Sequence, residues 1–424
     1  MPDLLATACA LVDPLPSGER RSLLVRWADR LERAAESLAQ TITTATQKPI
    51  RLARHEVKRA VAVVRSTADA MVLIEPRLLD LGDGGKAEIT RVALGPVLAV
   101  TPFNFPLNLA CHKLAPALAG GCPVIWKPSP RAPGVAELAL ELLDQAGCPE
   151  GLVQVAHLSD DAVAALVADE RLALLSFTGS DVVGRRLQRL ATRARVVLEL
   201  GGNAVVILHR TTDIDAAART IAFGACANAG QSCVSVQRIL IPDERDDWRD
   251  ALTAAFAALP TGDPSDEAIL CGPVIDAAAK TRIQHLIARY LAQGGRFLTG
   301  GTWNDRTLAP TLIDGLPAWA PGVHDTEAFA PLATLHRYHD LAEALHFAEL
   351  TPYGLQAGLY TDDDVAMRFA FSQLNVGALV INDVPTRRDD RLPFGGMKES
   401  GCGREGTFES ILDFTQPKVL WRPA

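Results

Sequence analysis

Residues 172–180 read Leu-Ala-Leu-Leu-Ser-Phe-Thr-Gly-Ser, a short apolar run that ends in a glycine-containing turn. Residues 181–190 follow with the spacing of a helix, and a second apolar run at 196–200 ends at Gly201-Gly202. Short apolar strands that alternate with helices are typical of a parallel sheet buried on both faces. This stretch therefore predicts an α/β fold.

The same alternation extends in both directions from this stretch. Further strands are predicted at 97–101, 124–126, 205–208, 237–241, 356–360 and 378–382. Further helices are predicted at 22–47, 57–74, 135–146, 214–229, 251–259 and 277–292. Because the pattern starts again after residue 202, we expect two Rossmann-like parallel-sheet α/β domains.

The composition excludes several classes of protein. The 424 residues carry a formal net charge of −8, and 48% of them are hydrophobic. This is the balance of a globular protein and not of a nucleic-acid binder or a membrane protein. The eight cysteines show no paired-ligand spacing, so we expect neither a metal site nor a disulfide framework. A reducing, cytoplasmic location follows as an expectation.

Four groups of residues carry the side chains of a reaction centre. In chain order they are Thr101-Pro-Phe-Asn-Phe-Pro106, Trp126-Lys-Pro-Ser-Pro130, the pair Ser176-Phe-Thr-Gly-Ser180 and Leu198-Glu-Leu-Gly-Gly-Asn203, and Asn228-Ala-Gly-Gln-Ser-Cys233. Downstream lie Glu327-Ala-Phe-Ala-Pro331 and Pro393-Phe-Gly-Gly-Met-Lys-Glu-Ser-Gly401. With these motifs the sequence resembles the aldehyde dehydrogenase superfamily from about residue 20 to the C-terminus. The resemblance implies NAD(P)-dependent oxidation of a small aldehyde to the carboxylic acid.

The resemblance also implies a division of the chain. It assigns 1–78 and 91–201 to a nucleotide-binding domain, 202–394 to a catalytic domain, 395–412 to a return segment, and 79–90 with 413–424 to a small β element. Gly82-Asp83-Gly84-Gly85 predicts the hairpin of that element. In the family the element extends a sheet across subunits, so we expect a homodimer or homotetramer. Family members usually begin with about forty more residues, which implies a shorter N-terminus here.

Cys233 is the predicted nucleophile. An aldehyde has no leaving group, so hydride loss is easier from a thiohemiacetal than from the free carbonyl, and a thiolate supplies that adduct. Activation requires a lowered pKa or a nearby base. The small and polar approach of Gly230-Gln231-Ser232 lets the backbone come close to a substrate. The other reading, a buried structural cysteine, applies to the remaining seven.

Two further residues complete the predicted catalytic set. The Asn104 amide, with the Cys233 backbone N–H, is expected to hold the developing oxyanion; the alternative is an asparagine that bonds its own turn. Glu199 ends a buried strand, where desolvation raises a carboxyl pKa, and is expected to be the general base that activates water. The alternative for Glu199 is an ion pair at the strand end. The coenzyme A-acylating branch of the family lacks this Glu, so Glu199 favours hydrolysis.

The cofactor site is predicted without a G-x-G-x-x-G motif. Thr178, Gly179 and Ser180 precede a helix whose N-terminus favours a pyrophosphate, and Gly201 belongs to the same predicted site. The resemblance implies that Lys127 binds the adenosine ribose, that Glu327 binds the nicotinamide ribose, and that Phe329 packs near the ring. For Lys127 the alternative is a solvated surface lysine.

The sequence leaves the choice between NAD and NADP open. NAD-preferring relatives often carry Glu three residues after the lysine, where this chain has Pro130. No carboxylate at that position would repel a 2′-phosphate, so NADP should be tolerated. Arg131 either contacts that phosphate or is solvated.

The substrate prediction rests on one arginine-rich loop. Asn382-Asp-Val-Pro-Thr386 followed by Pro393-Phe-Gly-Gly resembles the branch that acts on lactaldehyde and phosphonoacetaldehyde. Arg387, Arg388 and Arg391 lie between these motifs, and one or more of them is predicted to fork onto an anionic group of the substrate. The alternative is a surface loop whose Arg and Asp residues neutralise each other. The branch usually has Phe and His where Arg387 and Arg391 stand, so its specificity does not transfer.

Two other functions remain open from the sequence. One is an acyl-transferring or reductive relative that works through a thioester. The other is a binding or structural protein that has kept the fold without turnover. The set of Cys233, Glu199, Asn104, Lys127 and Glu327 argues against the second.

Overall fold

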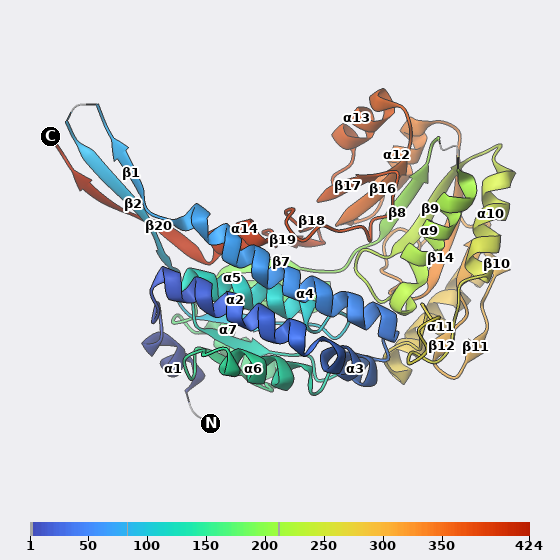
Figure 1. The fold of residues 1–424 in the computed structure, drawn as a ribbon. Helices are drawn as coiled ribbons and strands as arrows, with labels where there is room; N and C mark the ends of the chain where they lie inside the picture. Colours follow the sequence, from blue (N-terminus) through green and yellow to red (C-terminus); the bar gives the residue numbers. More distant parts are fainter. Residues whose placement is uncertain (1–2, 83, 211–212) are drawn as a thin grey trace.

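The computed structural model describes residues 3–82, 84–210 and 213–424. Two α/β bodies lie beside each other, and a β arm projects from the first body (Figure 1). The first sheet consists, from edge to edge, of β19 (Gly401–Cys402), β7 (Arg195–Glu199), β6 (Leu174–Thr178), β3 (Val97–Val100), β4 (Val124–Lys127) and β5 (Val153–Val155). All its neighbours pair in parallel except β19 with β7. The predicted α/β fold class is confirmed.

Helices cover the first sheet (Figure 1). They are α1 (Leu4–Ala10), α2 (Ser17–Arg33), α3 (Ala35–Thr46), α4 (Ile50–Ala70) with the 3-10 turn η1 (Met71–Ile74), α5 (Asn108–Gly120), α6 (Val135–Gln145), α7 (Asp160–Ala168), α8 (Asp181–Leu190) and α14 (Thr407–Asp413). The strands of a sheet covered in this way must be apolar on both faces. All four residues of β3 are accordingly buried hydrophobic residues.

The second body is built on a seven-stranded sheet. Its order is β10 (Arg296–Thr299), β13 (Thr311–Asp314), β14 (Leu332–Tyr338), β9 (Val236–Pro242), β8 (Ala204–Leu208), β16 (Gln356–Tyr360) and β17 (Ala378–Ile381). Its helices are α9 (Ile214–Cys226) with the turn η2 (Ala227–Gly230), α10 (Asp246–Ala257), α11 (Ala277–Ala292), α12 (Leu341–Glu349) and α13 (Asp364–Gln373). Two small ladders pair β11 (Trp303–Asn304) with β12 (Thr307–Leu308) and β15 (Tyr353–Gly354) with β18 (Met397–Lys398). The chain passes from one large sheet to the other between Glu199 and Ala204.

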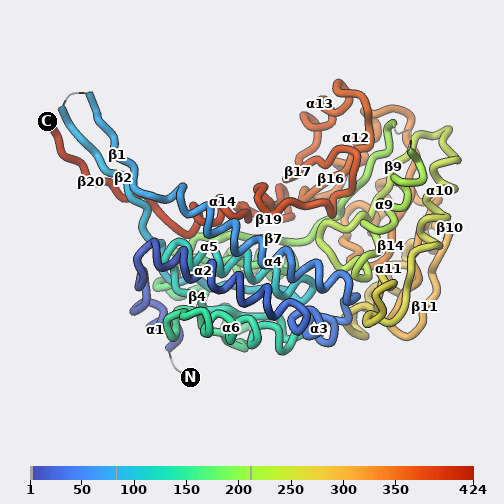
Figure 2. Tube along the Cα trace, in the orientation of Figure 1, coloured from blue at the N-terminus to red at the C-terminus, as the bar shows by residue number. Residues whose placement is uncertain are grey.

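The arm joins two distant parts of the sequence. β2 (Lys86–Ala93) pairs antiparallel with both β1 (Arg77–Asp80) and β20 (Thr415–Arg422). The arm extends away from both bodies and carries the C-terminus (Figure 2). Of the predicted turn at 82–85, Asp83 lies outside the described residues. The division into domains stays a prediction, although the large sheets separate at the residues where the sequence pattern restarts.

Four predicted helices differ from the structure by more than one residue at an end. The helix at 251–259 begins earlier, at Asp246, and ends at Ala257. The helix at 22–47 was expected to be continuous, but α2 ends at Arg33 and α3 begins at Ala35. The helix at 57–74 begins earlier, at Ile50, and its last turn is a 3-10 helix. The helix at 214–229 stops at Cys226, because Asn228 and Ala229 adopt left-handed φ values of 55° and 56°. Across the described residues, no helix has the length and apolarity needed to cross a membrane.

Candidate active site

One cavity of about 1280 Å³ collects most of the residues predicted from the sequence. Its lining includes Asn104, Lys127, Thr178, Gly179, Ser180, Glu199, Gly201, Cys233, Glu327, Phe329 and Arg388. These residues come from the ends of β4, β6 and β7, from the loops after β3 and β17, and from the segments before β9 and β14. The cavity therefore contains side chains from both α/β bodies.

A tight backbone turn presents Cys233. Asn228, Ala229 and Gly230 follow one another in left-handed conformations, and Gly230 has φ 64°. A β-carbon on Gly230 would overlap the carbonyl of Ala330, so only glycine fits there. Such strained backbone is typical of functional sites. The turn follows α9 and brings Cys233 into the cavity three residues before β9 begins.

The Cys233 thiol is not activated by its protein surroundings alone. Burial raises its pKa above the ordinary value, and the carboxyl groups of Glu327 and Glu199 raise it further. Of the two activating conditions named above, the lowered pKa is therefore absent and the nearby base is present. Of the two carboxyl groups near Cys233, Glu199 is the predicted base, and burial strongly raises its pKa.

Asn104 lies in the loop between β3 and α5, where its side chain is buried. Its Nδ2 donates to the Gln231 carbonyl at 3.0 Å, two residues before Cys233. Its Oδ1 is buried without a partner among the described residues. The hydrogen bond fixes the amide beside the Cys233 turn and leaves the second N–H of Nδ2 available as a donor.

Glu199 ends β7 and pairs in register with Thr178 of β6. Its side chain is buried, and within the described chain neither carboxyl oxygen has a hydrogen-bond partner. Burial, followed by the charge of Glu405, raises the pKa of Glu199 well above its ordinary value. The neighbouring Lys113 donates to Glu405 at 2.5 Å, so the negative charge of the two carboxyls is held on Glu405. A carboxyl with a raised pKa and free oxygens suits a general base.

The cofactor end of the cavity contains the turn between β6 and α8. A β-carbon on Gly179 would lie 2.6 Å from the Phe177 ring, so the turn packs closely only with glycine. The Thr178 hydroxyl is buried and has no partner among the residues described. With the α8 N-terminus and the Lys127 side chain beside it, these donors fit a pyrophosphate and a ribose.

Glu327 connects this end to the chain crossing between the sheets. Its Oε1 accepts a hydrogen bond from the Gly202 N–H at 2.9 Å, and a β-carbon on Gly201 would lie 2.9 Å from its Oε2. Burial raises the pKa of Glu327 to about 7, although the Gly202 hydrogen bond opposes that rise. Phe329 has a left-handed φ of 45° and meets Phe103 edge to face.

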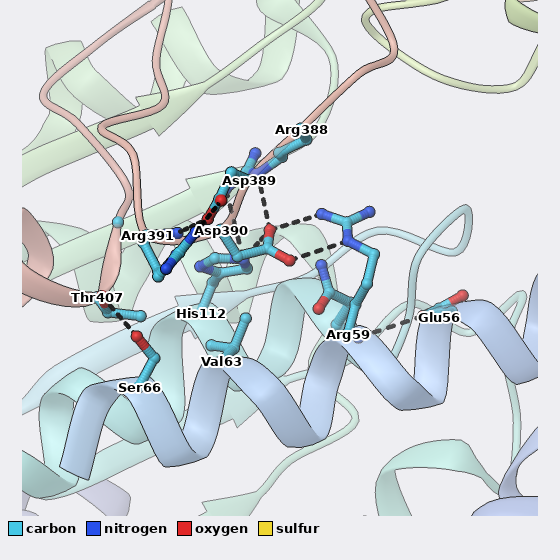
Figure 3. Close-up of polar contacts among 12 residues, drawn as sticks. Glu56, Arg59, Val63, Ser66, His112, Arg388, Asp389, Asp390, Arg391 and Thr407 are labelled. Atoms are coloured by element: carbon cyan, nitrogen blue, oxygen red, sulfur yellow. Dashed lines mark hydrogen bonds and ion pairs between the residues drawn. The ribbon is translucent and has the colours of Figure 1, made fainter. Parts of the chain in front are cut away.

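Figure 3 shows Asp390 in the loop after β17, where its carboxylate contacts side chains of α4, of α5 and of its own loop. Arg59 of α4 makes two hydrogen bonds to the Asp390 carboxylate, at 2.6 and 2.9 Å. Arg388 Nε donates to Asp390 Oδ1 at 2.9 Å, and His112 Nε2 of α5 lies 3.0 Å from the same oxygen. The Arg388 guanidinium also stacks 3.7 Å above the Phe394 ring. This group of Arg59, His112, Arg388 and Asp390 is called the Asp390 cluster below.

The electrostatics of the Asp390 cluster leave one positive charge uncompensated. Burial opposes ionisation of Asp390, but the hydrogen bonds from His112 and Arg59 outweigh it and hold its pKa below the usual value. Burial and the charge of Arg388 lower the pKa of His112, which favours neutral imidazole at pH 7. Within the cluster two guanidiniums therefore face one carboxylate, and the Glu405 carboxylate that also acts on Arg388 is already paired with Lys113. Arg59 and Arg388 both line the cavity.

The three arginines predicted for the substrate do not lie together. Arg388 has only 10% of its side chain exposed, whereas Arg387 and Arg391 are each 75% exposed. Arg391 is taken up by two hydrogen bonds to Asp389, and Arg387 lies 3.9 Å from Asp383. In the described part of the chain, neither lines the cavity. The alternative reading, a surface loop with mutual neutralisation, therefore describes Arg387 and Arg391.

Sequence reasoning missed Arg59 and Glu405 as parts of this cavity. Arg59 stands in the middle of a long helix and belongs to no motif, and its partner Asp390 is 331 residues away. Glu405 follows the last quoted motif, and nothing in its local sequence marks it as buried. Helical periodicity on α4 was the only available signal for Arg59, because it places that residue near the buried face.

The comparisons with known proteins agree with this geometry. The family model described as "Aldehyde dehydrogenase family" matches residues 7–420. A 3-sulfolactaldehyde dehydrogenase of Priestia aryabhattai is 32% identical over 420 residues, which span 97% of this chain and 87% of that protein. The chain belongs to the aldehyde dehydrogenase family.

Two solved structures extend the likeness to three dimensions. Aldehyde dehydrogenase 21 of Physcomitrella patens, in complex with its product succinate, superposes with a TM-score of 0.95 at 34% identity and covers 99% of this chain and 89% of that one. The glyceraldehyde-3-phosphate dehydrogenase GapN of Methanocaldococcus jannaschii, complexed with NADP, superposes with a TM-score of 0.95 at 29% identity. The match covers 99% of this chain and 93% of that one. This protein is an NAD(P)-dependent enzyme that oxidises an aldehyde to the carboxylic acid.

Proposed function

We propose that the enzyme oxidises small aldehydes that carry an anionic group, with Arg388 as the residue that binds the anion. The observation that carries this proposal is the buried Arg388 guanidinium, which lines the cavity and belongs to a cluster with one uncompensated positive charge. A carboxylate, phosphate or sulfonate on the substrate neutralises that charge. Arg59 is a second donor on the same cavity wall.

The protein's own residues divide the reaction into two halves. Cys233 attacks the aldehyde carbon, its proton passes to a base, and Asn104 Nδ2 with the Cys233 N–H holds the oxyanion of the thiohemiacetal. The bound nicotinamide supplies the hydride acceptor. Glu199 then takes a proton from water, which attacks the thioester; the C–S bond breaks, the acid leaves, and the Cys233 thiol is restored. The raised pKa of Glu199 suits both proton transfers.

The cofactor residues are part of the same proposal. Lys127, the Thr178–Ser180 turn and the α8 N-terminus would hold the adenosine ribose and the pyrophosphate, and Gly201 leaves room for Glu327. Glu327 and Phe329 would contact the nicotinamide half. Hydrolysis, and not transfer to coenzyme A, is favoured by the free carboxyl of Glu199 beside Cys233.

A rate panel tests the substrate and the nucleophile together. Reduced-cofactor formation is measured with succinic semialdehyde, glyceraldehyde 3-phosphate and phosphonoacetaldehyde against hexanal and benzaldehyde. We expect the anionic aldehydes to be preferred and Cys233→Ala to be inactive.

Arg388→Gln should raise the KM for anionic aldehydes by about tenfold or more, the cost of one charge-assisted hydrogen bond. Arg391→Gln is the matched control, because its guanidinium is outside the cavity and paired with Asp389. A rate with hexanal equal to the rates with the anionic aldehydes would contradict the proposal.

The arm supports a second proposal, a homodimer or homotetramer. Leu78, Val419, Leu420 and Trp421 are 80%, 58%, 56% and 62% exposed, which is unusual for a cluster of apolar side chains. β17 is one of the two edge strands of the second sheet and is only half-buried. An arm strand of one copy would cover such an edge of another copy. Trp421→Glu should shift the molecular mass in solution towards the monomer, and an unchanged mass would contradict this assembly.

A further inference from the structure

Gln237 lies on β9, four residues after Cys233, and its side chain is buried. Both ends of its amide are used. Nε2 donates to the Gly202 carbonyl at 2.9 Å, and Oε1 accepts from the Ala328 N–H at 2.6 Å. The amide thus joins the crossing between the two sheets to the segment that carries Glu327.

The two segments that Gln237 joins are the two that fix the Glu327 carboxyl. Gly202, whose carbonyl accepts from Gln237, donates its N–H to Glu327 Oε1. Ala328, whose N–H donates to Gln237, is the next residue after Glu327. The Gln237 side chain therefore fixes the position of the Glu327 carboxyl through the segments on both sides of it.

The neighbouring residue on β9 reinforces the same connection. Arg238 Nε donates to Asn203 Oδ1 at 2.6 Å, and Asn203 Nδ2 donates to the carbonyls of Val323 and Thr326 at 2.8 Å each. These contacts hold the backbone on either side of the Gln237 amide. Arg238 also donates to the carbonyls at the end of α12, so its role extends beyond the site.

We propose that Gln237 is a positioning residue for the nicotinamide half of the cofactor and acts through Gly202 and Glu327. This inference rests on the proposed function, in which Glu327 binds the nicotinamide ribose. In the proposed function the adenosine half lies against Lys127 and the Thr178–Ser180 turn, and within the described residues the hydrogen bonds of Gln237 go to other segments. Loss of the Gln237 amide should therefore weaken one half of the cofactor site and spare the other.

Binding of two ligands to the full-length protein separates the halves. Titration calorimetry with NADP⁺ and NAD⁺ reports the whole cofactor, and ADP reports the adenosine half alone. Gln237→Met has similar length and removes both hydrogen-bonding groups. We expect the Kd for NADP⁺ and NAD⁺ to rise about tenfold and the Kd for ADP to stay within about twofold. Unchanged NAD(P)⁺ binding, or an equal loss of ADP binding, would overturn the proposal.

Thr334→Val is the matched control for a general loss of packing. The Thr334 hydroxyl donates to the backbone carbonyl of Gln237 at 3.2 Å, lies 2.8 Å from His336 Nε2 and does not contact the Gln237 amide. The substitution removes both of these buried hydrogen bonds at the same place and should leave both ligands bound as in wild type. If Gln237→Met does not fold, Gln237→Glu keeps the length and the acceptor for Ala328 and loses the donor to Gly202; it should show the same selective loss.

A double substitution tests the route through Glu327. In a Glu327→Gln background, Gln237→Met should add little to the loss of NADP⁺ affinity, because the group that it positions is already altered. If the two losses of NADP⁺ affinity add fully in the double variant, Gln237 does not act through Glu327. Wild-type protein that binds neither ADP nor NADP⁺ would instead contradict the proposed cofactor site, which is a different outcome from a failure of the Gln237 inference.

Discussion

Gly202 passes so close to Cys233 that a β-carbon on the glycine would overlap the Cys233 carbonyl oxygen. The two residues belong to different motifs, one at the crossing between the sheets and one three residues before β9. Their contact means that the nucleophile is held against the segment that also binds Glu327. The geometry of the reaction centre therefore depends on the absence of a single side chain.

Gly202→Ala should displace the Cys233 turn. We expect kcat/KM to fall by about a hundredfold, since small displacements of reacting groups are costly, and stability to fall by about 1–3 kcal/mol from overpacking. Steady-state kinetics and urea unfolding measure the two effects. Gly18→Ala is the control, because a β-carbon there meets nothing within 4 Å and Gly18 lies in α2. That helical substitution should be silent or slightly stabilising.

Glu199→Gln should slow both halves of the reaction. The variant has no carboxylate to take the proton of the Cys233 thiol or, later, that of water, so we expect no burst of reduced cofactor and a steady rate about 10² to 10⁴ times lower. Stopped-flow absorbance measures both the first turnover and the steady rate. A variant that turns over at the wild-type steady rate would remove Glu199 from the mechanism.

The pH profile of the wild-type enzyme follows from the same residue. Because burial and Glu405 raise the pKa of Glu199, the deacylation rate should increase with pH through an inflection well above 4.5. The rate rises with pH, and does not fall, because a general base works only when it is deprotonated. Pre-steady-state deacylation rates across the pH range measure it. An inflection near the ordinary value would mean that Glu199 is not buried in the working enzyme.

The strands near the site could be predicted closely from the sequence. β16 and the helices α8 and α11 have the predicted bounds, β3 and β4 differ by one residue at one end, and β7 is shifted by one residue at both ends. These elements begin or end at glycines, at prolines or at sharp changes of hydrophobicity, which are local signals. The break between α2 and α3 at Ala34 was missed because alanine is the best helix former and leaves no such signal.

The candidate site was predictable where motifs end strands and not where it depends on long-range packing. Glu199, Thr178 and Lys127 each end a strand of one parallel sheet, so their convergence follows from topology. The choice among Arg387, Arg388 and Arg391 depends on the path of an irregular loop. Its inward residue is fixed by Asp390, Arg59 and His112, which come from three separate parts of the chain.

Asp390→Asn should cost stability, because two buried or half-buried guanidiniums lose their carboxylate. Removing one partner of a buried pair typically costs about 3 kcal/mol, and urea unfolding at pH 7 measures it. The folded-state pKa of Asp390 is lowered, so this stabilisation is present above its unfolded pKa near 3.8 and disappears as pH falls through the folded value. The difference between wild type and variant should therefore be full at pH 7 and shrink below about pH 4.

Asp389→Asn is the matched control for Asp390→Asn. Asp389 is the adjacent residue and also pairs with an arginine, but its side chain is 41% exposed and Arg391 is 75% exposed. Exposed pairs contribute roughly 0–1 kcal/mol, so this variant should unfold almost as wild type does. Equal losses in the two variants would mean that the Asp390 cluster is no better shielded than the surface loop.

Arg131 should decide between the two cofactors. Its Nε lies 3.0 Å from Asp276 Oδ2, and Arg131 lines the same cavity as Lys127. A 2′-phosphate offers Arg131 a more highly charged partner than Asp276, so we expect Arg131→Gln to lower the ratio of kcat/KM for NADP⁺ to that for NAD⁺ by about tenfold. Initial rates with saturating aldehyde measure the ratio. An unchanged ratio would make Arg131 a solvated residue.

Asp276→Ser tests the same competition from the other side. Asp276 Oδ1 accepts from the Ala279 N–H at 2.7 Å and begins α11, and serine keeps that helix cap while it removes the charge. With Asp276 no longer competing, Arg131 is free for the 2′-phosphate, and the NADP⁺ to NAD⁺ ratio should rise. The two variants must move the ratio in opposite directions; movement in the same direction would show that loss of the Arg131–Asp276 contact itself, and not the 2′-phosphate, causes the change.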